Sequence, residues 1–121
     1  MFHHVQLSCP AGSEDVSRGF YSGVLGLGEI EKPPVLAARG GCWFRGNGIE
    51  LHLGVEDDFR PARRAHPAIL VTGIGGWAAR LAAAGYPADF DGNFPGMRRF
   101  YSRDPHGNRL EFLEPADAGG S

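Results

Sequence analysis

The sequence predicts an α+β fold built of two tandem βαβββ modules. Two observations lead to this prediction: hydrophobic periodicity gives the order strand, helix and three strands twice along the chain, and the two halves of the chain resemble each other. We expect the first module at residues 3–55 and the second at residues 66–115. Residues 56–65 are charged, contain a proline and follow neither period, which predicts a surface linker. The length of 121 residues corresponds to a single domain that contains both modules.

The first module opens with a strand and a helix. In residues 3–8, Val5 and Leu7 alternate with polar residues that include His4, which is typical of a strand with two different faces. We expect Ser13 to cap a helix that ends at Gly26. The apolar face of this helix is predicted to collect Val16, Phe20, Tyr21, Val24 and Leu25.

Three strands complete the first module. A short strand is expected at residues 27–31, followed by an extended break at Pro33-Pro34. Residues 38–45 and 49–55 then predict a hairpin around the turn Gly46-Asn47-Gly48.

The second module repeats this order. Residues 66–72 predict a strand and residues 74–84 a helix, with Gly85 at its C-terminal cap. The remaining elements are expected to be a short strand at 87–90, a strand at 97–103, a type I turn at Asp104–Gly107 and a strand at 109–114. The small and polar residues 116–121 are expected to form a frayed tail.

The composition limits the classes of partner. The net charge is −2 and the isoelectric point is near 6.2, which predicts no nucleic-acid binding. Apolar stretches are far shorter than the ~20 residues that span a bilayer, and Met1–Pro10 lacks the features of a signal peptide, so we expect a cytoplasmic protein without membrane contact. Cys9 and Cys42 are expected to be reduced, buried thiols. A small-molecule substrate is the partner that remains.

The internal repeat brings four candidate metal ligands into correspondence. HVQLSC at 4–9 matches HPAILV at 66–71, and GNGIEL at 46–51 matches GNRLEF at 107–112. The matched positions of interest are two histidines and two glutamates: His4, His66, Glu50 and Glu111.

Imidazole and carboxylate ligands suit a divalent ion such as Zn, Ni, Fe or Mn, and we expect one such ion per site. The ion could polarise a carbonyl and stabilise a developing enediolate, while Glu111 or Glu50 takes a proton from the adjacent carbon and returns it. His52 competes with Glu50 as a ligand, because it lies two residues further along the same strand face.

The remaining polar and aromatic residues of interest are not predicted to be metal ligands or catalytic groups. His3 and His106 are expected to be surface histidines, and the arginines Arg60, Arg63 and Arg64 are expected to belong to a hydrated linker. Four strand aromatics are compatible with either the core or a ligand pocket, namely Trp43, Phe44, Phe100 and Tyr101.

Five segments together resemble the vicinal oxygen chelate superfamily, which contains glyoxalases, bleomycin-resistance proteins and ring-cleaving dioxygenases. They are HHVQL at 3–7, FYSGVLGL at 20–27, IELHL at 49–53, AHPAILV at 65–71 and DPHGNRLEFLEP at 104–115. The resemblance covers residues 3–115 and implies paired βαβββ modules that form partial barrels around a metal cleft. It also implies that His4, Glu50, His66 and Glu111 hold the metal, with Glu111 at a position that also serves as a base.

The resemblance leaves several activities open. A glyoxalase-like lyase or isomerase acting on a small carbonyl or α-hydroxy carbonyl compound is the first expectation. The alternatives are a non-enzymatic antibiotic-binding protein of the bleomycin-resistance type and an iron-dependent extradiol-type dioxygenase. Small members commonly form homodimers, so we expect a homodimer here; a half-barrel of about fifty residues also has too little core to close alone.

Overall fold

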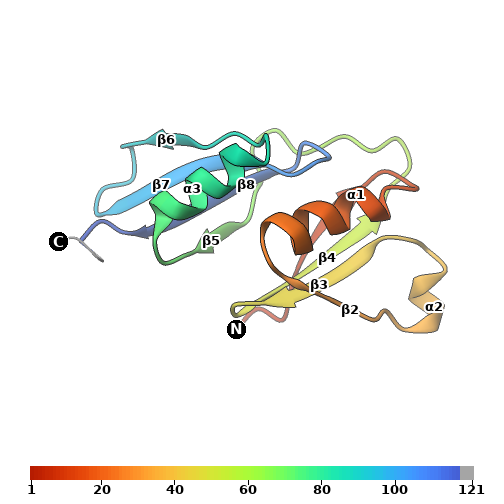
Figure 1. Ribbon diagram of the computed structural model, residues 1–121. Helices are drawn as coiled ribbons and strands as arrows, with labels where there is room; N and C mark the ends of the chain where they lie inside the picture. The colour runs from red at the N-terminus through yellow and green to blue at the C-terminus, as the bar shows by residue number, and fades with distance from the viewer. Residues whose placement is uncertain (118–121) are drawn as a thin grey trace. The chain divides into compact units, whose positions relative to one another are not determined.

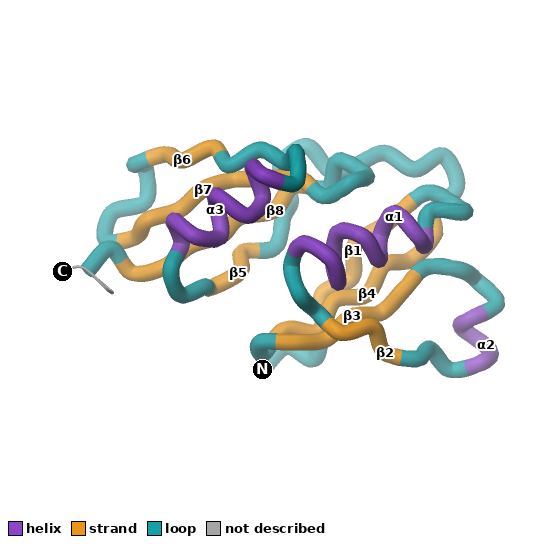
Figure 2. Tube along the Cα trace, in the orientation of Figure 1, coloured by secondary structure: helices purple, strands orange, loops and turns teal. Residues whose placement is uncertain are grey.

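The computed structural model describes residues 1–117 and divides the chain into two compact units, Met1–Pro61 and Ala62–Ser121. Each unit has its own sheet and its own helical segment or segments, as Figures 1 and 2 show. The units are described separately below.

The first unit contains a four-stranded sheet of order β1-β4-β3-β2. Its elements are β1 (Val5–Cys9), α1 (Glu14–Arg18), the π-helix η1 (Gly19–Val24), β2 (Gly28–Ile30), α2 (Pro34–Ala37), β3 (Cys42–Gly46) and β4 (Ile49–Val55). Strand β1 runs parallel to β4, and the β2–β3 and β3–β4 pairs are antiparallel.

The second unit has the equivalent sheet order, β5-β8-β7-β6. Its elements are β5 (Ala68–Leu70), α3 (Ile74–Ala83), β6 (Asp89–Asp91), β7 (Met97–Arg103) and β8 (Arg109–Pro115). Strand β5 runs parallel to β8, and the other two pairs are antiparallel. The predicted α+β class with two βαβββ modules is therefore confirmed, with both sheets open.

Local structure differs from the sequence prediction around the first helix. Ser13 occupies the N-cap position, but its side chain makes no capping hydrogen bond and donates instead to the carbonyl of Pro10, at 2.6 Å. Val16 is 56% exposed, so it does not join the predicted apolar face. The buried side of this segment is carried mainly by Phe20 and Tyr21 in η1, where the change from α- to π-geometry alters which side chains face the sheet.

The predicted break at Pro33-Pro34 instead begins a short helix. Pro33 has extended backbone angles, as expected for a residue that precedes proline, and Pro34 is the first residue of α2. Proline is favourable at this position because the first helical N–H needs no intrahelical acceptor.

The helix-facing side of each sheet forms the core of its unit. In the first unit Tyr21 stacks on Phe44, which lies opposite Leu51 in the β3–β4 register. In the second unit Trp77 stacks on Phe112, which also stacks on Phe100. The helices that supply Tyr21 and Trp77 lie across one face of each sheet (Figure 2).

Two turns bring the chain into the strands that carry the candidate glutamates. Asn47 and Gly48 both have positive φ, 51° and 77°, as the two central residues of a type I′ hairpin turn require, and Ile49 begins β4 immediately after them. In the second unit the side chain of Asp104 accepts hydrogen bonds from the backbone N–H groups of His106 and Asn108, both at 2.9 Å. This side chain fixes the turn that precedes β8.

The tail and the cysteines complete the comparison with the sequence. Ala116 donates its N–H to the carbonyl of Gly96 at 2.8 Å, and residues 118–121 of the predicted frayed tail lie outside the described residues. Cys9 and Cys42 form no disulfide, and each is 1% exposed, in agreement with the expected buried thiols. Burial raises the pKa of the Cys42 thiol to about 11. Within residues 1–117, no helix combines the length and the apolar character needed to cross a membrane.

The Glu14→Gln substitution should destabilise the protein in a pH-dependent way. The Glu14 carboxylate accepts the backbone N–H of Gly41 at 2.8 Å, and this hydrogen bond lowers its pKa below 4.5. A depressed pKa means that the stabilisation is present at neutral pH and is lost as the pH falls through the folded-state pKa. Urea unfolding at pH 7 should show a loss of about 1 kcal/mol, and the difference between the two proteins should shrink as the pH falls through the folded-state pKa of Glu14.

Asp15→Asn provides the matched control, because Asp15 is the neighbouring carboxylate and its side chain is 98% exposed. It should change the unfolding free energy less than Glu14→Gln does. A Glu14→Gln difference that stays constant from pH 3 to pH 7 would contradict the assignment of the stabilisation to the carboxylate.

Candidate metal and catalytic site

Both candidate glutamates lie on the sheet face that is turned away from the helix. Side chains alternate along a strand, so the burial of Leu51 in the core places Glu50 and His52 on the opposite face of β4. The same reasoning applies to β8, where Phe112 packs under Trp77 and Glu111 points to the other side.

In the first unit, Glu50 is paired with a histidine and an arginine. Its Oε2 lies 2.8 Å from Nε2 of His52, and its Oε1 accepts from Nε of Arg45 at 3.0 Å. The hydrogen bond with His52, followed by the contact with Arg45, lowers the pKa of Glu50. Burial lowers the pKa of His52, which is therefore neutral at pH 7. Because the ionised carboxylate can only accept, Nε2 of His52 carries the hydrogen and donates it.

His52 lies between two other rings. Its ring centroid is 3.8 Å from that of Trp43, with an interplanar angle of 5°, and 3.9 Å from that of His4, with an angle of 16°. Imidazole lone pairs lie in the ring plane, so two nearly parallel rings cannot direct nitrogens at the same ion. In this arrangement His4 and His52 cannot both direct a nitrogen at one ion.

His3 and His4 contact each other ahead of the first strand. Nδ1 of His3 lies 2.9 Å from Nδ1 of His4. Strand β1 begins only at Val5, so the alternation of strand side chains does not govern the two residues before it. His3 is nevertheless exposed, as expected for a surface histidine.

In the second unit, His66 bridges a backbone carbonyl and a buried carboxylate. Nδ1 of His66 lies 2.6 Å from the carbonyl oxygen of Arg64, and Nε2 lies 2.9 Å from Oε1 of Glu111. Glu111 is 5% exposed. Since the carbonyl can only accept, Nδ1 must donate to it, and a neutral ring then presents its Nε2 lone pair to an anionic oxygen. A hydrogen or a metal ion must therefore lie between Nε2 of His66 and Oε1 of Glu111.

Arg99 is a site residue that the sequence analysis missed. Its Nη1 donates to Oε2 of Glu111 at 3.3 Å, and its Nε and Nη2 donate to the two carboxylate oxygens of Asp91 at 2.9 and 3.4 Å. These hydrogen bonds are the main cause of a lowered pKa for Asp91. The signal was present in the alternating segment MRRFYSR at 97–103, which puts Arg99 and Tyr101 on one face of β7.

The structure separates the four strand aromatics. Phe44 and Phe100 are 0% exposed and belong to the two cores. Trp43 and Tyr101 are half-buried on the faces that carry the glutamates, where Trp43 stacks on His52 and Tyr101 makes an edge contact with His66 at 5.4 Å.

The four repeat-matched residues do not have equivalent partners. His66 contacts Glu111 directly, whereas His4 stacks on His52 rather than contacting Glu50. The cross-strand neighbour of Glu50 is Arg45, and that of Glu111 is Tyr101. Among the described residues 1–117, no three His, Cys, Asp or Glu side chains are arranged to hold a metal ion together. The metal ligand set therefore remains a prediction.

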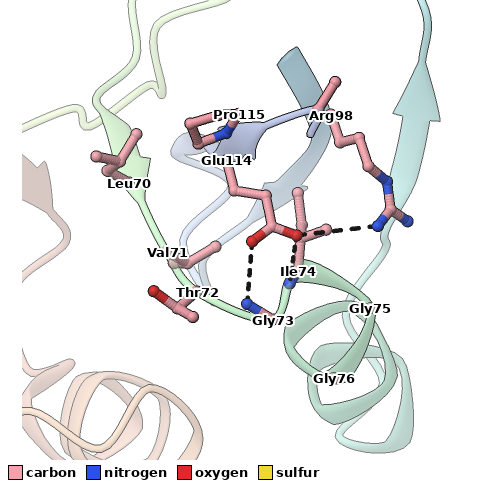
Figure 3. A pocket seen from close by; sticks show the side chains of 11 residues that line it. Leu70, Val71, Thr72, Gly73, Ile74, Gly75, Gly76, Arg98, Glu114 and Pro115 are labelled. Carbon is pink, nitrogen blue, oxygen red and sulfur yellow. Dashed lines mark hydrogen bonds and ion pairs between the residues drawn. The ribbon is translucent and has the colours of Figure 1, made fainter. Parts of the chain in front are cut away.

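A pocket of about 480 Å³ lies elsewhere in the second unit, around the N-terminus of α3 (Figure 3). Its lining contains none of the predicted ligands. The buried carboxylate of Glu114 fills the polar part of this pocket and accepts the backbone N–H groups of Gly73 and Ile74 at 3.1 and 3.2 Å. Glu114 projects from the core-facing side of β8, which is opposite to the Glu111 side. We therefore assign this pocket a structural role, with Glu114 capping α3.

Comparison with solved structures identifies close and distant relatives. A glyoxalase family protein from Bacillus anthracis is 44% identical, with a TM-score of 0.90 over 95% of this chain and 94% of that chain. A variant of the fosfomycin resistance protein FosX from Listeria monocytogenes, complexed with Mn(II) and 1S,2S-dihydroxypropylphosphonic acid, is 15% identical, with a TM-score of 0.79 over 97% of this chain and 93% of that chain. The antibiotic binding protein TnmS3 from a Streptomyces species is 22% identical, with a TM-score of 0.70 over 96% of this chain and 98% of that chain.

The likeness to the last two structures concerns the fold alone. No protein-family model matches the sequence, and no curated protein matches it.

The Glu114→Ala substitution should test the structural role of the pocket carboxylate. Without it, the N–H groups of Gly73 and Ile74 lose their acceptor, and the expected loss of unfolding free energy is about 2 kcal/mol in urea titrations. Arg98→Met is the control, because its contact with Glu114 is long, at 3.9 Å, and solvent-exposed. Equal effects of the two substitutions would contradict the capping assignment.

Proposed function

The chain belongs to the glyoxalase family of the vicinal oxygen chelate superfamily, and from this premise we propose that it is a metal-dependent lyase or isomerase. We further propose that its substrate is a small carbonyl or α-hydroxy carbonyl compound. The observation that carries the proposal is the position of His66 between the Arg64 carbonyl and the Glu111 carboxylate.

The His66 arrangement fits a metal ligand. Metal-binding histidines commonly donate their second ring N–H to a backbone carbonyl, which fixes the tautomer and directs the lone pair of the other nitrogen at the ion. His66 has this hydrogen bond at Nδ1, and its Nε2 faces an anionic oxygen that is itself a suitable donor atom.

The proximity and the chemistry of the donor atoms also fit. The distance from His66 Nε2 to Glu111 Oε1 is 2.9 Å. We propose His4, Glu50, His66 and Glu111 as the ligands, a mixed imidazole and carboxylate set that suits Zn, Ni, Fe or Mn.

His52 is proposed to orient Glu50 rather than to bind the metal. Its Nε2 hydrogen is committed to Glu50, and its ring is held between Trp43 and His4. A hydrogen-bonded partner of this kind fixes the direction of a carboxylate ligand. We therefore propose Glu50, rather than His52, as the ligand.

The protein's own residues would carry the proton transfer. A bound divalent ion supplies positive charge that polarises a carbonyl oxygen. Glu111, with Glu50 as the second candidate, takes the proton from the hydroxyl-bearing carbon and returns it to the former carbonyl carbon, while a proton moves between the two oxygens. The isomerisation is therefore balanced without an external oxidant or reductant. The predicted homodimer and cytoplasmic location remain predictions.

Elemental analysis of the untagged protein should find about one divalent ion per chain, and His4→Ala and Glu111→Gln should each reduce this occupancy strongly because each removes a proposed ligand. His106→Ala is the matched control, because it removes an imidazole from the turn before β8. Parent-like occupancy in both ligand variants would refute the ligand set.

Absence of metal in the parent protein, even after incubation with Zn, Ni, Mn and ferrous iron, would overturn the proposed function. The alternative would then be a metal-free antibiotic-binding protein. An iron-dependent dioxygenase would instead show oxygen uptake with catechols when loaded with ferrous iron.

A second comparison distinguishes Glu50 from His52 as ligand. His52→Phe keeps a flat ring between Trp43 and His4 but removes the hydrogen bond to Glu50, so metal affinity should fall by about tenfold. Glu50→Ala removes the proposed ligand itself and should weaken binding more. Competition with a metallochromic chelator measures both effects, and a larger loss in His52→Phe than in Glu50→Ala would make His52 the ligand.

A further inference from the structure

We propose that Arg99, held by Asp91, is a positioning residue that fixes the Glu111 carboxylate so that only one of its oxygens is available beside His66. This inference rests on the proposed function in treating Glu111 as a metal ligand. Its structural basis lies entirely within the second unit.

The guanidinium of Arg99 is itself held in place. Asp91 binds it through two parallel hydrogen bonds, at 2.9 and 3.4 Å, a planar arrangement that lysine cannot reproduce. The guanidinium also lies 5.0 Å from the centroid of the Tyr101 ring and 5.5 Å from that of Phe94. The Arg99 side chain is only 16% exposed. These contacts restrict Arg99 to one orientation before it meets Glu111.

Arg99 and His66 divide the two oxygens of Glu111 between them. Nη1 of Arg99 approaches Oε2 at 3.3 Å, and Nε2 of His66 approaches Oε1 at 2.9 Å. Arg99 is opposite Leu113 in the β7–β8 register, so it reaches Glu111 diagonally across the strand pair. With Oε2 engaged by Arg99, Glu111 presents Oε1 alone beside the imidazole.

The arginine that contacts the other candidate carboxylate is more exposed to solvent. Arg45 approaches Glu50 at 3.0 Å, but the Arg45 side chain is 62% exposed, and its only ion pair among the described residues is with Glu50. The exposed side chain must lose conformational entropy to hold this geometry. Arg99 is therefore the more firmly held of the two arginines that contact the candidate carboxylates.

The first arm of the test does not require a metal. Crystal structures of the metal-free parent, Arg99→Met and Arg98→Met proteins would be compared. We expect the Glu111 side chain to leave His66 or to take several conformers in Arg99→Met, because methionine keeps the apolar length but donates no hydrogen bond. Arg98 is the adjacent arginine on the opposite face of β7, so Arg98→Met should leave Glu111 in place. A single, parent-like Glu111 conformer in Arg99→Met would overturn the proposal.

The second arm measures metal dissociation constants for the same proteins and for Asp91→Asn and Arg99→Lys. Arg99→Met should weaken binding by about 10- to 100-fold, the usual effect of removing a hydrogen-bonding partner of a ligand. Asp91→Asn should weaken it in the same direction but less, and Arg99→Lys should restore part of the affinity. Parent-like affinity in Arg99→Met, or an equal loss in Arg98→Met, would overturn the proposal.

The two arms separate the two proposals. A parent protein that binds no metal would refute the proposed function, while the crystal structures would still decide whether Arg99 positions Glu111. Circular dichroism checks folding of each variant. If Arg99→Met does not fold, Asp91→Asn and Arg99→Lys replace it in both arms. The proposal would then be overturned if both variants kept the Glu111 conformation and the metal affinity of the parent.

Discussion

The alternation of side chains on the last strand of each module determines where its chemistry can lie. In β4, Leu51 is held in the core, so Glu50 must point to the face that the helix leaves uncovered. In β8, Phe112 fixes Glu111 in the same way. A shift of one residue in either register would bury the glutamate against the helix and expose an apolar side chain. Apolar packing on one face therefore specifies the polar chemistry on the other.

Burial of Glu111 imposes a second constraint. A carboxylate that is 5% exposed needs compensation for its lost hydration, and it receives this from His66 and Arg99. Arg99 is in turn balanced by Asp91. In the first unit, Glu50 is compensated by His52 and by the more exposed Arg45. The two modules thus share a fold and a glutamate position while differing in the network that surrounds the glutamate.

Much of the fold followed from the sequence, because periodicity and turn residues act locally. Strand 97–103 and the hairpin turn at Asn47-Gly48 agree with their predicted positions. The π-helical segment after Arg18 could not be predicted, since it depends on how Phe20 and Tyr21 pack against the sheet. The helix that begins at Pro34 was missed because two prolines in succession also fit an extended break.

The candidate site was less accessible to sequence reasoning. The internal repeat drew attention to His4, Glu50, His66 and Glu111, but it gave no information about their partners. The contact of Arg99 with Glu111 crosses between two strands, and that with Asp91 comes from a third. Such contacts depend on strand register, which one sequence does not specify. His4, which stacks on His52, precedes the first residue of β1, so the alternation of strand side chains could not predict this contact.

The stacking of Trp43 on His52 gives the first unit an optical reporter. The His52 ring, 3.8 Å away, forms part of the environment of the Trp43 indole, and any rearrangement of His52, Glu50 or His4 changes that contact. The chain contains two tryptophans, and the other, Trp77, packs on Phe112 at the core-facing side of its own sheet. Emission changes on adding a ligand can therefore be assigned to the first unit by replacing Trp77 with phenylalanine, without attaching a dye to the protein.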